Sequence, residues 1–359
     1  MTVQQWHRPS IGLLSLEPWD ATWRRNQHLV SQLIEQDLVA SVAFINPPVK
    51  MRHIPAIRPL RGVRVVTPHL VIPRQRGGGV LVAREVSARI RGIDLLWVND
   101  PTLGSAVSRR NVPVVYDVTD DWRAARLPDE HRRRLVRSED ALAGRSTTIV
   151  CSNVLRDRWR ERYGVDAVVI QNGVDLDAHR EAAPRRLPGP GPHALYVGTL
   201  HQERLDVELL LRLASSGLVG IVDLVGPDHL SDAARAALGA SAHIRVHPPV
   251  PHQEVPSLMA GADVLMSPHL VDDFTLSLDA IKSFEYLASG RPVVATPTSG
   301  FQLLTRAPGL WLASGEDFLS AVREALISRE SWEGRAAGHS WADRARQFSA
   351  VLRHALDHD

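Results

Sequence analysis

A lysine and a carboxylate lie together in the segment 277–296, which has the pattern of a helix, a break and a buried strand. Apolar residues at helical spacing indicate the helix, namely Ile281, Phe284, Leu287 and Ala288. Gly290 supplies a left-handed C-cap, and Pro292 prevents the helix from continuing. From this helix Lys282 can reach a phosphate, and a surface pair with Glu285 is the alternative.

A second candidate anion site follows an apolar segment at 194–198, which ends in Gly198. A glycine at this place lets the backbone approach a phosphate, and Arg204 can pair with the charge. A helix predicted to start near Leu205 adds its free amides. A solvated loop arginine is the alternative explanation of Arg204.

Three carboxylates, Asp117, Asp120 and Asp121, follow another apolar segment at 112–116. Because carboxylates this close repel one another, we expect at least one to have a raised pKa and to serve as a base. Asp120 and Asp121 are the catalytic candidates. The alternative is that they face solvent or cap the segment that follows.

The elements that must position these residues alternate between short apolar strands and helices. The first series of strands is predicted at 11–16, 39–45, 63–66, 95–98, 112–116, 148–151 and 167–170, with helices at 23–35, 80–91 and 130–143. The second series is predicted at 194–198, 219–225, 243–246, 264–266, 292–295 and 309–312. This alternation predicts parallel sheets with right-handed crossovers, whose ligands bind beyond the carboxyl ends of the strands.

A segment rich in Pro and Gly, 171–193, separates the two series and marks a linker. We therefore predict a first doubly wound domain at 1–171 and a hinge at 172–192. A second domain at 193–335 and a closing helix at 336–359 complete the chain.

Composition narrows the class of protein. A length of 359 residues suits two domains, each with its own core. The single cysteine rules out a disulfide framework, and the scattered histidines lack ligand spacing, so we predict no metal. Because the sequence contains no apolar run of ~20 residues and no signal-peptide core, we expect a cytoplasmic protein.

The net charge of +2 conceals an excess of cations in residues 1–180 and of anions in the remainder. A basic half can recruit an anionic acceptor or make peripheral contact with the inner membrane surface. The alternative is the arginine usage of a GC-rich genome. Because no aromatic residues interleave the basic runs, we expect no nucleic-acid binding.

Four features in order resemble GT-B nucleotide-sugar glycosyltransferases, in particular bacterial family 4 (group 1) enzymes. They are the turn Asn172-Gly173-Val174-Asp175, the Gly198 loop, the helix carrying Glu285 and the closing helix. The resemblance implies an α/β fold with two Rossmann-like doubly wound domains facing a cleft, and a C-terminal helix crossing back to the first. It also implies metal-independent transfer of a sugar, without a cofactor, from a nucleotide-diphosphate sugar to an acceptor hydroxyl or amine. The acceptor would be a small molecule, a glycan or a lipid-linked compound.

The resemblance assigns nucleotide-sugar binding to the second domain and places Glu285 at the ribose of the donor. The expected donor-binding residues are Gly198, Thr199, Arg204, His252, Ser277, Lys282 and Glu285. Thr199 stands where the family usually has a basic residue. Ser277 stands where many retaining members have a glutamate, and we expect it to cap the helix and share a face with Glu285.

The resemblance assigns acceptor binding to the first domain. The segment 17–28 is similar to the acceptor loop and helix of a bacterial subgroup with Trp, Arg and Gln-His-Leu at this place. The expected acceptor-binding residues are Trp19, Asp20, Arg24, Arg25 and Asp100. Related enzymes often have a histidine near position 119, and its absence leaves Asp120 or Asp121 as the nearest ionisable group.

The resemblance favours retention of the sugar's stereochemistry, whereas inversion would need a carboxylate base such as Asp120. Two other functions fit the same residues. One is a GT-B epimerase or pseudo-glycosyltransferase. The other is an inactive nucleotide-sugar-binding partner of another transferase.

Overall fold

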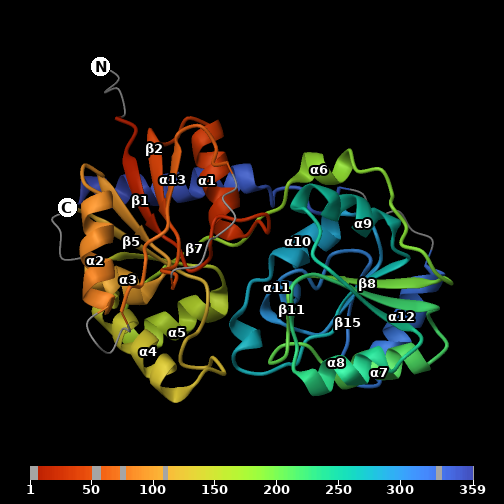
Figure 1. Ribbon diagram of the computed structural model, residues 1–359. Coiled ribbons are helices and arrows are strands. Elements are labelled where there is room, and N and C mark those ends of the chain that lie inside the picture. Colours follow the sequence, from red (N-terminus) through yellow and green to blue (C-terminus); the bar gives the residue numbers. More distant parts are fainter. Residues whose placement is uncertain (1–6, 51–57, 73–77, 108–111, 329–333, 359) are drawn as a thin grey trace. The chain divides into compact units, whose positions relative to one another are not determined.

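The computed structural model describes residues 7–50, 58–72, 78–107, 112–328 and 334–358 (Figure 1). Their contacts divide the chain into two compact units. Unit 1 comprises residues 1–171 and 341–359, and unit 2 comprises residues 172–340. Each unit is built on a parallel sheet, of seven strands in unit 1 and six in unit 2, so the predicted pair of doubly wound α/β domains is confirmed.

The sheet of unit 1 has the strand order β3-β2-β1-β4-β5-β6-β7, and every neighbouring pair is parallel. The strands are β1 (Ser10–Leu14), β2 (Ser41–Ile45), β3 (Val63–Val66), β4 (Leu95–Val98), β5 (Val114–Val118), β6 (Thr147–Val150) and β7 (Val168–Val169). The central strands β4 and β5 are buried along their whole length, as expected for a sheet covered on both faces.

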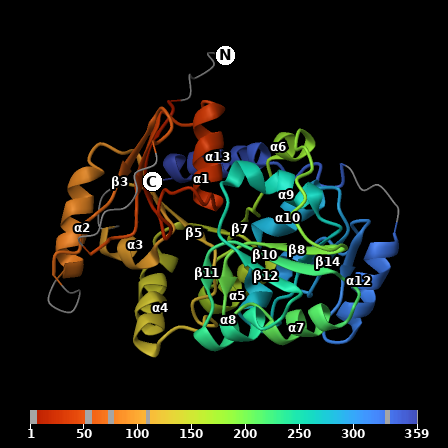
Figure 2. The same ribbon diagram turned by 45° about the vertical axis from the view of Figure 1, so that its right-hand side comes forward.

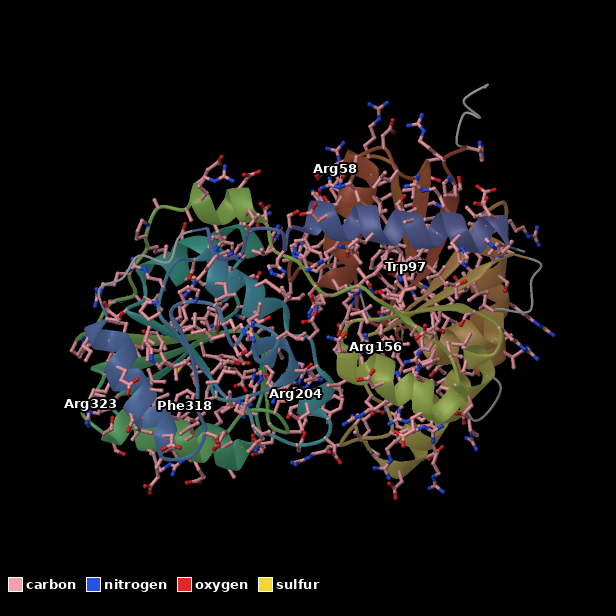
Figure 3. The ribbon with its side chains drawn as sticks, turned by 180° about the vertical axis from the view of Figure 1, so that it is seen from behind. Arg58, Trp97, Arg156, Arg204, Phe318 and Arg323 are labelled. Atoms are coloured by element: carbon pink, nitrogen blue, oxygen red, sulfur yellow. The ribbon has the colours of Figure 1, made fainter. Side chains whose placement is uncertain are left out.

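Helices cover both faces of this sheet. They are α1 (Arg25–Glu35), α2 (Gly78–Arg89), α3 (Pro101–Val107), α4 (Asp129–Ala143), α5 (Asn153–Tyr163) and α13 (Trp341–Asp357). Residues of α2 to α5 share one core cluster with the strands, while α1 and α13 lie side by side on the other face (Figures 1 and 2). Figure 3 shows Trp97 of β4 beneath α13, where its ring lies 4.4 Å from that of Phe348.

The closing helix α13 begins at Trp341, later than the predicted position 336. Gly334 and Gly338 have φ angles of +76° and +83°, in the left-handed region that interrupts a helix. The turn they form therefore delays the helix start.

The sheet of unit 2 has the order β12-β10-β8-β13-β14-β15, which repeats the arrangement of unit 1. Its strands are β8 (His193–Val197), β10 (Ile221–Val225), β12 (Ile244–His247), β13 (Val264–Ser267), β14 (Val293–Ala295) and β15 (Leu310–Leu312). A separate two-stranded sheet pairs β9 (Leu200–His201) with β11 (Asp228–His229).

Two groups of helices bury the faces of this second sheet. One core cluster contains residues of α7 (Val207–Ser215), α8 (Asp232–Gly239) and α12 (Asp317–Ile327). A second contains residues of α9 (Val255–Gly261), α10 (Ile281–Ala288) and α11 (Ser299–Gln302). In Figures 1 and 2, α7 and α8 lie side by side on their face. The remaining short helices are α6 (Leu176–Arg180), η2 (His252–Glu254) and η3 (Thr275–Ser277).

Helix α10 is shorter than its sequence pattern suggested. It begins at Ile281 with Ala280 as N-cap, and Gly290 follows it with a φ of +69°, as predicted. The turn before it is fixed within unit 2, because the backbone N–H of Asn172 donates to Oδ2 of Asp279 at 2.5 Å.

Across the described ranges, no group of three or more His, Cys, Asp or Glu side chains is placed to hold a metal ion. Within the same ranges no helix has both the length and the apolar character needed to cross a membrane. The one cysteine, Cys151, is buried beside the carbonyl of Thr119, which lies 3.4 Å from its Sγ.

Candidate functional site

The strand order identifies one place in each sheet where a ligand fits best. The order in which successive strands are added to the sheet reverses between β1 and β4 in unit 1 and between β8 and β13 in unit 2. At such a switch point the loops diverge at the carboxyl ends of the strands and leave a crevice. The predicted donor-binding loops follow β8 and β13, so five of the seven expected donor residues belong to the loop after β8 or to α10 beside it.

The loops after β8 and β13 are hydrogen-bonded to each other. The N–H of Leu270 donates to the carbonyl of Arg204 at 2.7 Å, and the N–H of Asp206 donates to the carbonyl of Pro268 at 2.8 Å. Segments 198–206 and 268–274 therefore form one continuous rim, which we call the β8–β13 rim.

The hydroxyl of Tyr196, on β8, gathers groups from three elements around the rim. Nζ of Lys282 lies 2.7 Å from this hydroxyl, the Thr199 carbonyl lies at 3.0 Å, and Nε2 of His269 lies at 3.2 Å. The Tyr196 side chain is buried in the core of the unit. It thereby joins the loop after β8, the loop after β13 and helix α10 at one atom.

Gly198 leaves the space that the Lys282 ammonium occupies. Its φ is +145°, in a region that side chains rarely adopt. A Cβ at this position would lie 2.8 Å from Nζ of Lys282. The predicted role of Gly198 in close approach is thus accompanied by a second role, which is to admit the lysine.

Arg204 is supported from below by an aromatic ring. Its guanidinium carbon lies 4.9 Å from the ring centre of Phe274, within the range of a cation–π contact. Ser277 donates to the carbonyl of Phe274 at 2.6 Å, so it fixes the turn that carries this ring. Figure 3 marks Arg204 in this part of unit 2.

Lys282 and Glu285 have perturbed ionisation. Burial and the neighbouring Arg204 lower the pKa of Lys282 to about 7, against the opposing effect of Glu285. Burial raises the pKa of Glu285 to about 7, against the opposing effect of Lys282. Two groups with displaced pKa values on one helix, at a switch point, are the pattern of a functional site.

Two histidines, His201 and His269, lie near these cations and carry no charge at pH 7. Burial, with Lys282 and Arg204 nearby, lowers the pKa of His269 well below its ordinary value. Burial and the same arginine lower the pKa of His201 to about 4. Both rings are therefore neutral at pH 7, and Nε2 of His269 lies within hydrogen-bond distance of the Tyr196 hydroxyl.

Two expectations about helix ends in unit 2 were wrong. Ser277 does not cap α10 and does not share its face with Glu285, because it lies in η3 and is fully buried. The amides of α7 are not left open for a phosphate either. Asp206 caps that helix, and its Oδ1 accepts the N–H of Leu209 at 2.9 Å.

His252 is the predicted donor residue that the structure places elsewhere in unit 2. It lies in η2, and its electrostatic neighbour is Asp175 at the start of α6. Burial lowers the pKa of His252, against the opposing effect of Asp175. The structure thus groups Gly198, Thr199 and Arg204 with the two α10 residues, and leaves His252 outside that group.

The strand ends of unit 1 hold a buried polar network. Arg25 makes a two-pronged ion pair with Asp117, with distances of 2.9 and 3.0 Å. Asn26 donates to Oγ of Ser15 at 2.8 Å and to Oδ1 of Asn99 at 2.9 Å. Arg25 was expected to contact the acceptor, but its side chain is almost fully buried in this framework.

The other predicted acceptor residues divide into buried and accessible ones. Trp19 is 3% exposed and packs edge-on against Phe44, with ring centres 5.1 Å apart. Asp100 accepts the N–H of Thr102 at 2.8 Å and so caps the start of α3. Asp20 and Arg24 remain partly exposed and form an ion pair at 3.4 Å.

The two predicted catalytic carboxylates have different surroundings. Asp121 is buried and receives Arg158 at 2.7 Å and Arg162 at 2.8 Å. Burial alone would raise the pKa of Asp121, but hydrogen bonds from Arg162 and Arg158 outweigh it, so its pKa is lowered. Asp121 is therefore not a carboxylate with a raised pKa. Asp120 is partly exposed, accepts the hydroxyl of Thr119 at 3.0 Å and stays the candidate base.

Tyr196 and His269 escaped the sequence analysis. Tyr196 reads as one more apolar position of a buried strand, and only its position two residues before Gly198 signals a link to the loop. His269 comes two residues after β13, where the strand-end rule would have identified it.

Two family models match the chain, one over each half. The model described as Glycosyltransferase Family 4 matches residues 24–178, and the model described as Glycosyl transferases group 1 matches residues 191–328. Together they cover most of both units.

Among curated relatives, the chain is similar to TuaH of Bacillus subtilis, a protein named for teichuronic acid biosynthesis. The two are 26% identical over 269 residues, which is 67% of this chain and 68% of TuaH. Other curated relatives are 30% identical, but the chain spans only 48% to 58% of their length.

Solved structures share the fold. A sucrose-phosphate synthase from Thermosynechococcus elongatus superposes with a TM-score of 0.77 at 18% identity, covering 98% of this chain and 100% of that one. The Anabaena protein HepE, solved with UDP and glucose, superposes with a TM-score of 0.69 at 15% identity, covering 97% and 100%. The predicted GT-B fold is thereby confirmed.

Proposed function

Because the chain belongs to the family 4, group 1 glycosyltransferases, we propose that it moves a sugar from a nucleoside-diphosphate sugar to an acceptor hydroxyl or amine. The observation that carries this proposal is the group formed by Gly198, Arg204, Lys282 and Glu285 at the switch point of unit 2. It combines an open backbone position, two cations and one carboxylate, which suit a diphosphate and a ribose.

The diphosphate of the donor would lie on the β8–β13 rim. Lys282 and Arg204 supply positive charge, and the positive-φ glycine Gly198 lets the backbone come close to a phosphate oxygen. Diphosphate binding would favour the protonated form of Lys282, because a nearby anion stabilises the charged amine.

Charge neutralisation by these two side chains supports a reaction without a metal ion or other cofactor. As the glycosidic bond to the donor phosphate breaks, negative charge develops on the leaving diphosphate. Two cations fixed beside it would stabilise that charge in the transition state. The side chains thus do what a divalent cation does in other phosphate sites.

Glu285 would accept hydrogen bonds from the ribose hydroxyls. It lies one turn after Lys282 on α10, so a ribose and its attached diphosphate can engage the same helix. The ionised carboxylate accepts these bonds more strongly than the protonated one, and the diphosphate-bound Lys282 would favour the ionised form.

Unit 1 would bind the acceptor through its accessible strand-end residues. Asp20, Arg24 and Asp120 are partly exposed, whereas Arg25, Trp19 and Asp100 would support that surface from within. The acceptor classes are a small molecule, a glycan or a lipid-linked compound, and the name of TuaH supports a glycan. We favour retention, in which a donor phosphate oxygen takes the acceptor proton, and inversion would assign that proton to Asp120.

The test is turnover over a panel of UDP-, GDP- and dTDP-sugars, measured as donor hydrolysis and as transfer. We expect Glu285→Ala to raise the donor KM at least tenfold, since a charge-assisted hydrogen bond is lost. Glu324→Ala, which removes an exposed glutamate from α12, is the matched control. Turnover that Glu285→Ala leaves unchanged would contradict the donor-site assignment.

The same panel separates the alternatives. Nucleotide binding without turnover against any acceptor would favour an inactive nucleotide-sugar-binding partner. Interconversion of donor sugars without transfer would favour an epimerase. Asp120→Asn should leave a retaining reaction largely active and should abolish an inverting one.

A further inference from the structure

Tyr196 has a part in this site that packing alone does not explain. We propose that the Tyr196 hydroxyl is a positioning group, which holds the Lys282 ammonium beside Gly198 at the place where the donor diphosphate binds. This inference rests on the proposed function and adds a residue to it.

The contact between tyrosine and lysine is made twice, at the hydroxyl and at the ring. Nζ of Lys282 donates to the hydroxyl at 2.7 Å and lies 3.9 Å from the ring centre. A flexible lysine with four rotatable bonds loses conformational freedom when its end is fixed, and fixing it before a ligand arrives reduces that loss on binding. The phenol thus pre-organises the cation.

The same hydroxyl is itself fixed by the rim. Its single proton goes to the Thr199 carbonyl at 3.0 Å, which leaves the oxygen free to accept from Lys282, and Nε2 of His269 lies 3.2 Å away. The lysine position is therefore coupled to the loop after β8. A phenylalanine would keep the ring and lose all three links.

The space beside Gly198 shows why the position matters. Nζ of Lys282 lies 2.8 Å from the place where a Cβ of residue 198 would be, so the ammonium fills the glycine's side of the loop. An anion drawn to the backbone of Gly198 therefore meets the ammonium directly. If the lysine swung away, the diphosphate would lose its nearest cation.

The surroundings of Lys282 disfavour its protonated form, so a hydrogen-bond acceptor is needed to stabilise the charge. Burial and Arg204, from the loop, disfavour the ammonium, while Glu285 on α10 favours it. The phenol oxygen accepts a hydrogen bond from the ammonium and so favours the charged form without adding a negative charge. A second carboxylate in its place would repel the diphosphate.

The experiment is a calorimetric titration with UDP, GDP and dTDP and with their monophosphates. Tyr196→Phe should weaken the affinity for the preferred diphosphate about tenfold and the affinity for the monophosphate less. The affinity at high pH should also begin to fall at a lower pH than in the wild type, because Lys282 loses its proton more readily. Loss of packing alone would move neither the pH profile nor the ratio of diphosphate to monophosphate affinity.

A double-mutant cycle makes the coupling measurable. Lys282→Met should weaken diphosphate binding about a hundredfold, and adding Tyr196→Phe to it should cause little further loss. Tyr116→Phe, which removes an equally buried phenol from β5 of unit 1, should leave the affinity unchanged.

The outcomes distinguish a failure of the positioning role of Tyr196 from a failure of the proposed function. If the losses from Tyr196→Phe and Lys282→Met multiply, or if Tyr196→Phe binds the diphosphate as the wild type does, the positioning role is refuted while the proposed function stands. If the wild type binds none of the three diphosphates, the proposed function fails and this inference fails with it.

Discussion

Charged residues gather at the strand ends of both units, but they are arranged in opposite ways. In unit 1 buried carboxylates are matched by arginines, as in the pairs of Asp117 with Arg25 and of Asp121 with Arg158 and Arg162. In unit 2 the Lys282 ammonium donates to a neutral group, the Tyr196 hydroxyl, and Glu285 on the same helix favours its charged form.

The difference shows how charge at a strand end serves either structure or binding. A matched pair neutralises itself and satisfies its own hydrogen bonds, so it fixes loops and has little attraction left for a ligand. A lysine held by a tyrosine hydroxyl beside a glycine keeps its attraction for an anion. This contrast is why we assign the diphosphate to unit 2.

The largest effect should come from breaking the matched pair in unit 1. Arg25→Met leaves Asp117 buried without its bidentate partner, and we expect unfolding free energy to fall by about 3–5 kcal/mol. Urea unfolding measures this loss. The double variant Arg25→Met/Asp117→Asn should recover part of it, because the uncompensated charge is then gone. If the unfolding free energy of the single variant fell by well under 1 kcal/mol, the ion pair would not be part of the structural framework of unit 1.

Glu139 is the exception in unit 1 and sharpens the contrast. Burial, together with nearby Asp121, raises the pKa of Glu139 to about 7, and among the described residues its Oε2 makes no hydrogen bond. The folded state holds this proton more tightly than the unfolded state. The stability contribution is therefore complete below pH 4.5 and is lost as the pH rises to about 7.

Glu139→Gln should consequently stabilise the protein by about 2 kcal/mol at pH 8. The gain should shrink as the pH falls and vanish near the ordinary glutamate pKa. Urea titrations at several pH values test this, with Glu130→Gln, an exposed change on the same helix, as control. If the gain in unfolding free energy did not depend on pH, the charge of Glu139 would not be its cause.

A smaller effect is expected in the pH dependence of nucleotide binding by unit 2. Affinity should fall above pH 7 as Lys282 loses its proton, and below pH 7 as Glu285 gains one, by at most about tenfold per pH unit. Glu285→Gln should remove the acidic limb and keep the basic one. A flat profile in the wild type between pH 5 and 9 would mean that neither group contacts the ligand.

The sequence predicted the fold well, and three of the candidate donor residues lie in the loop that follows β8, at the switch point of unit 2. Alternating apolar segments and Pro-Gly-rich punctuation are local signals, and the strand-end rule converts them into positions for Gly198, Arg204 and the α10 residues. The GT-B resemblance supplied the rest of the architecture. These inferences needed no knowledge of side-chain contacts.

Roles that depend on a distant partner were not predictable in this way. Arg25 suggested a ligand-binding residue because its partner Asp117 lies 92 positions along the chain. Asp121 suggested a base for the same reason, since its two arginines come from α5. Tyr196 was not identified because a tyrosine that only packs in a buried strand and a tyrosine with a functional hydroxyl look the same in the sequence.

The most direct test of the account is the affinity of the Lys282→Met variant for the nucleoside diphosphate that the wild type binds most tightly. The account predicts a loss of about a hundredfold with the unfolding free energy little changed, because the lysine serves a ligand in unit 2 and not the framework. An unchanged affinity, with a stability loss like that of Arg25→Met, would contradict it. Lys282 would then belong to the matched, structural class of charges found in unit 1.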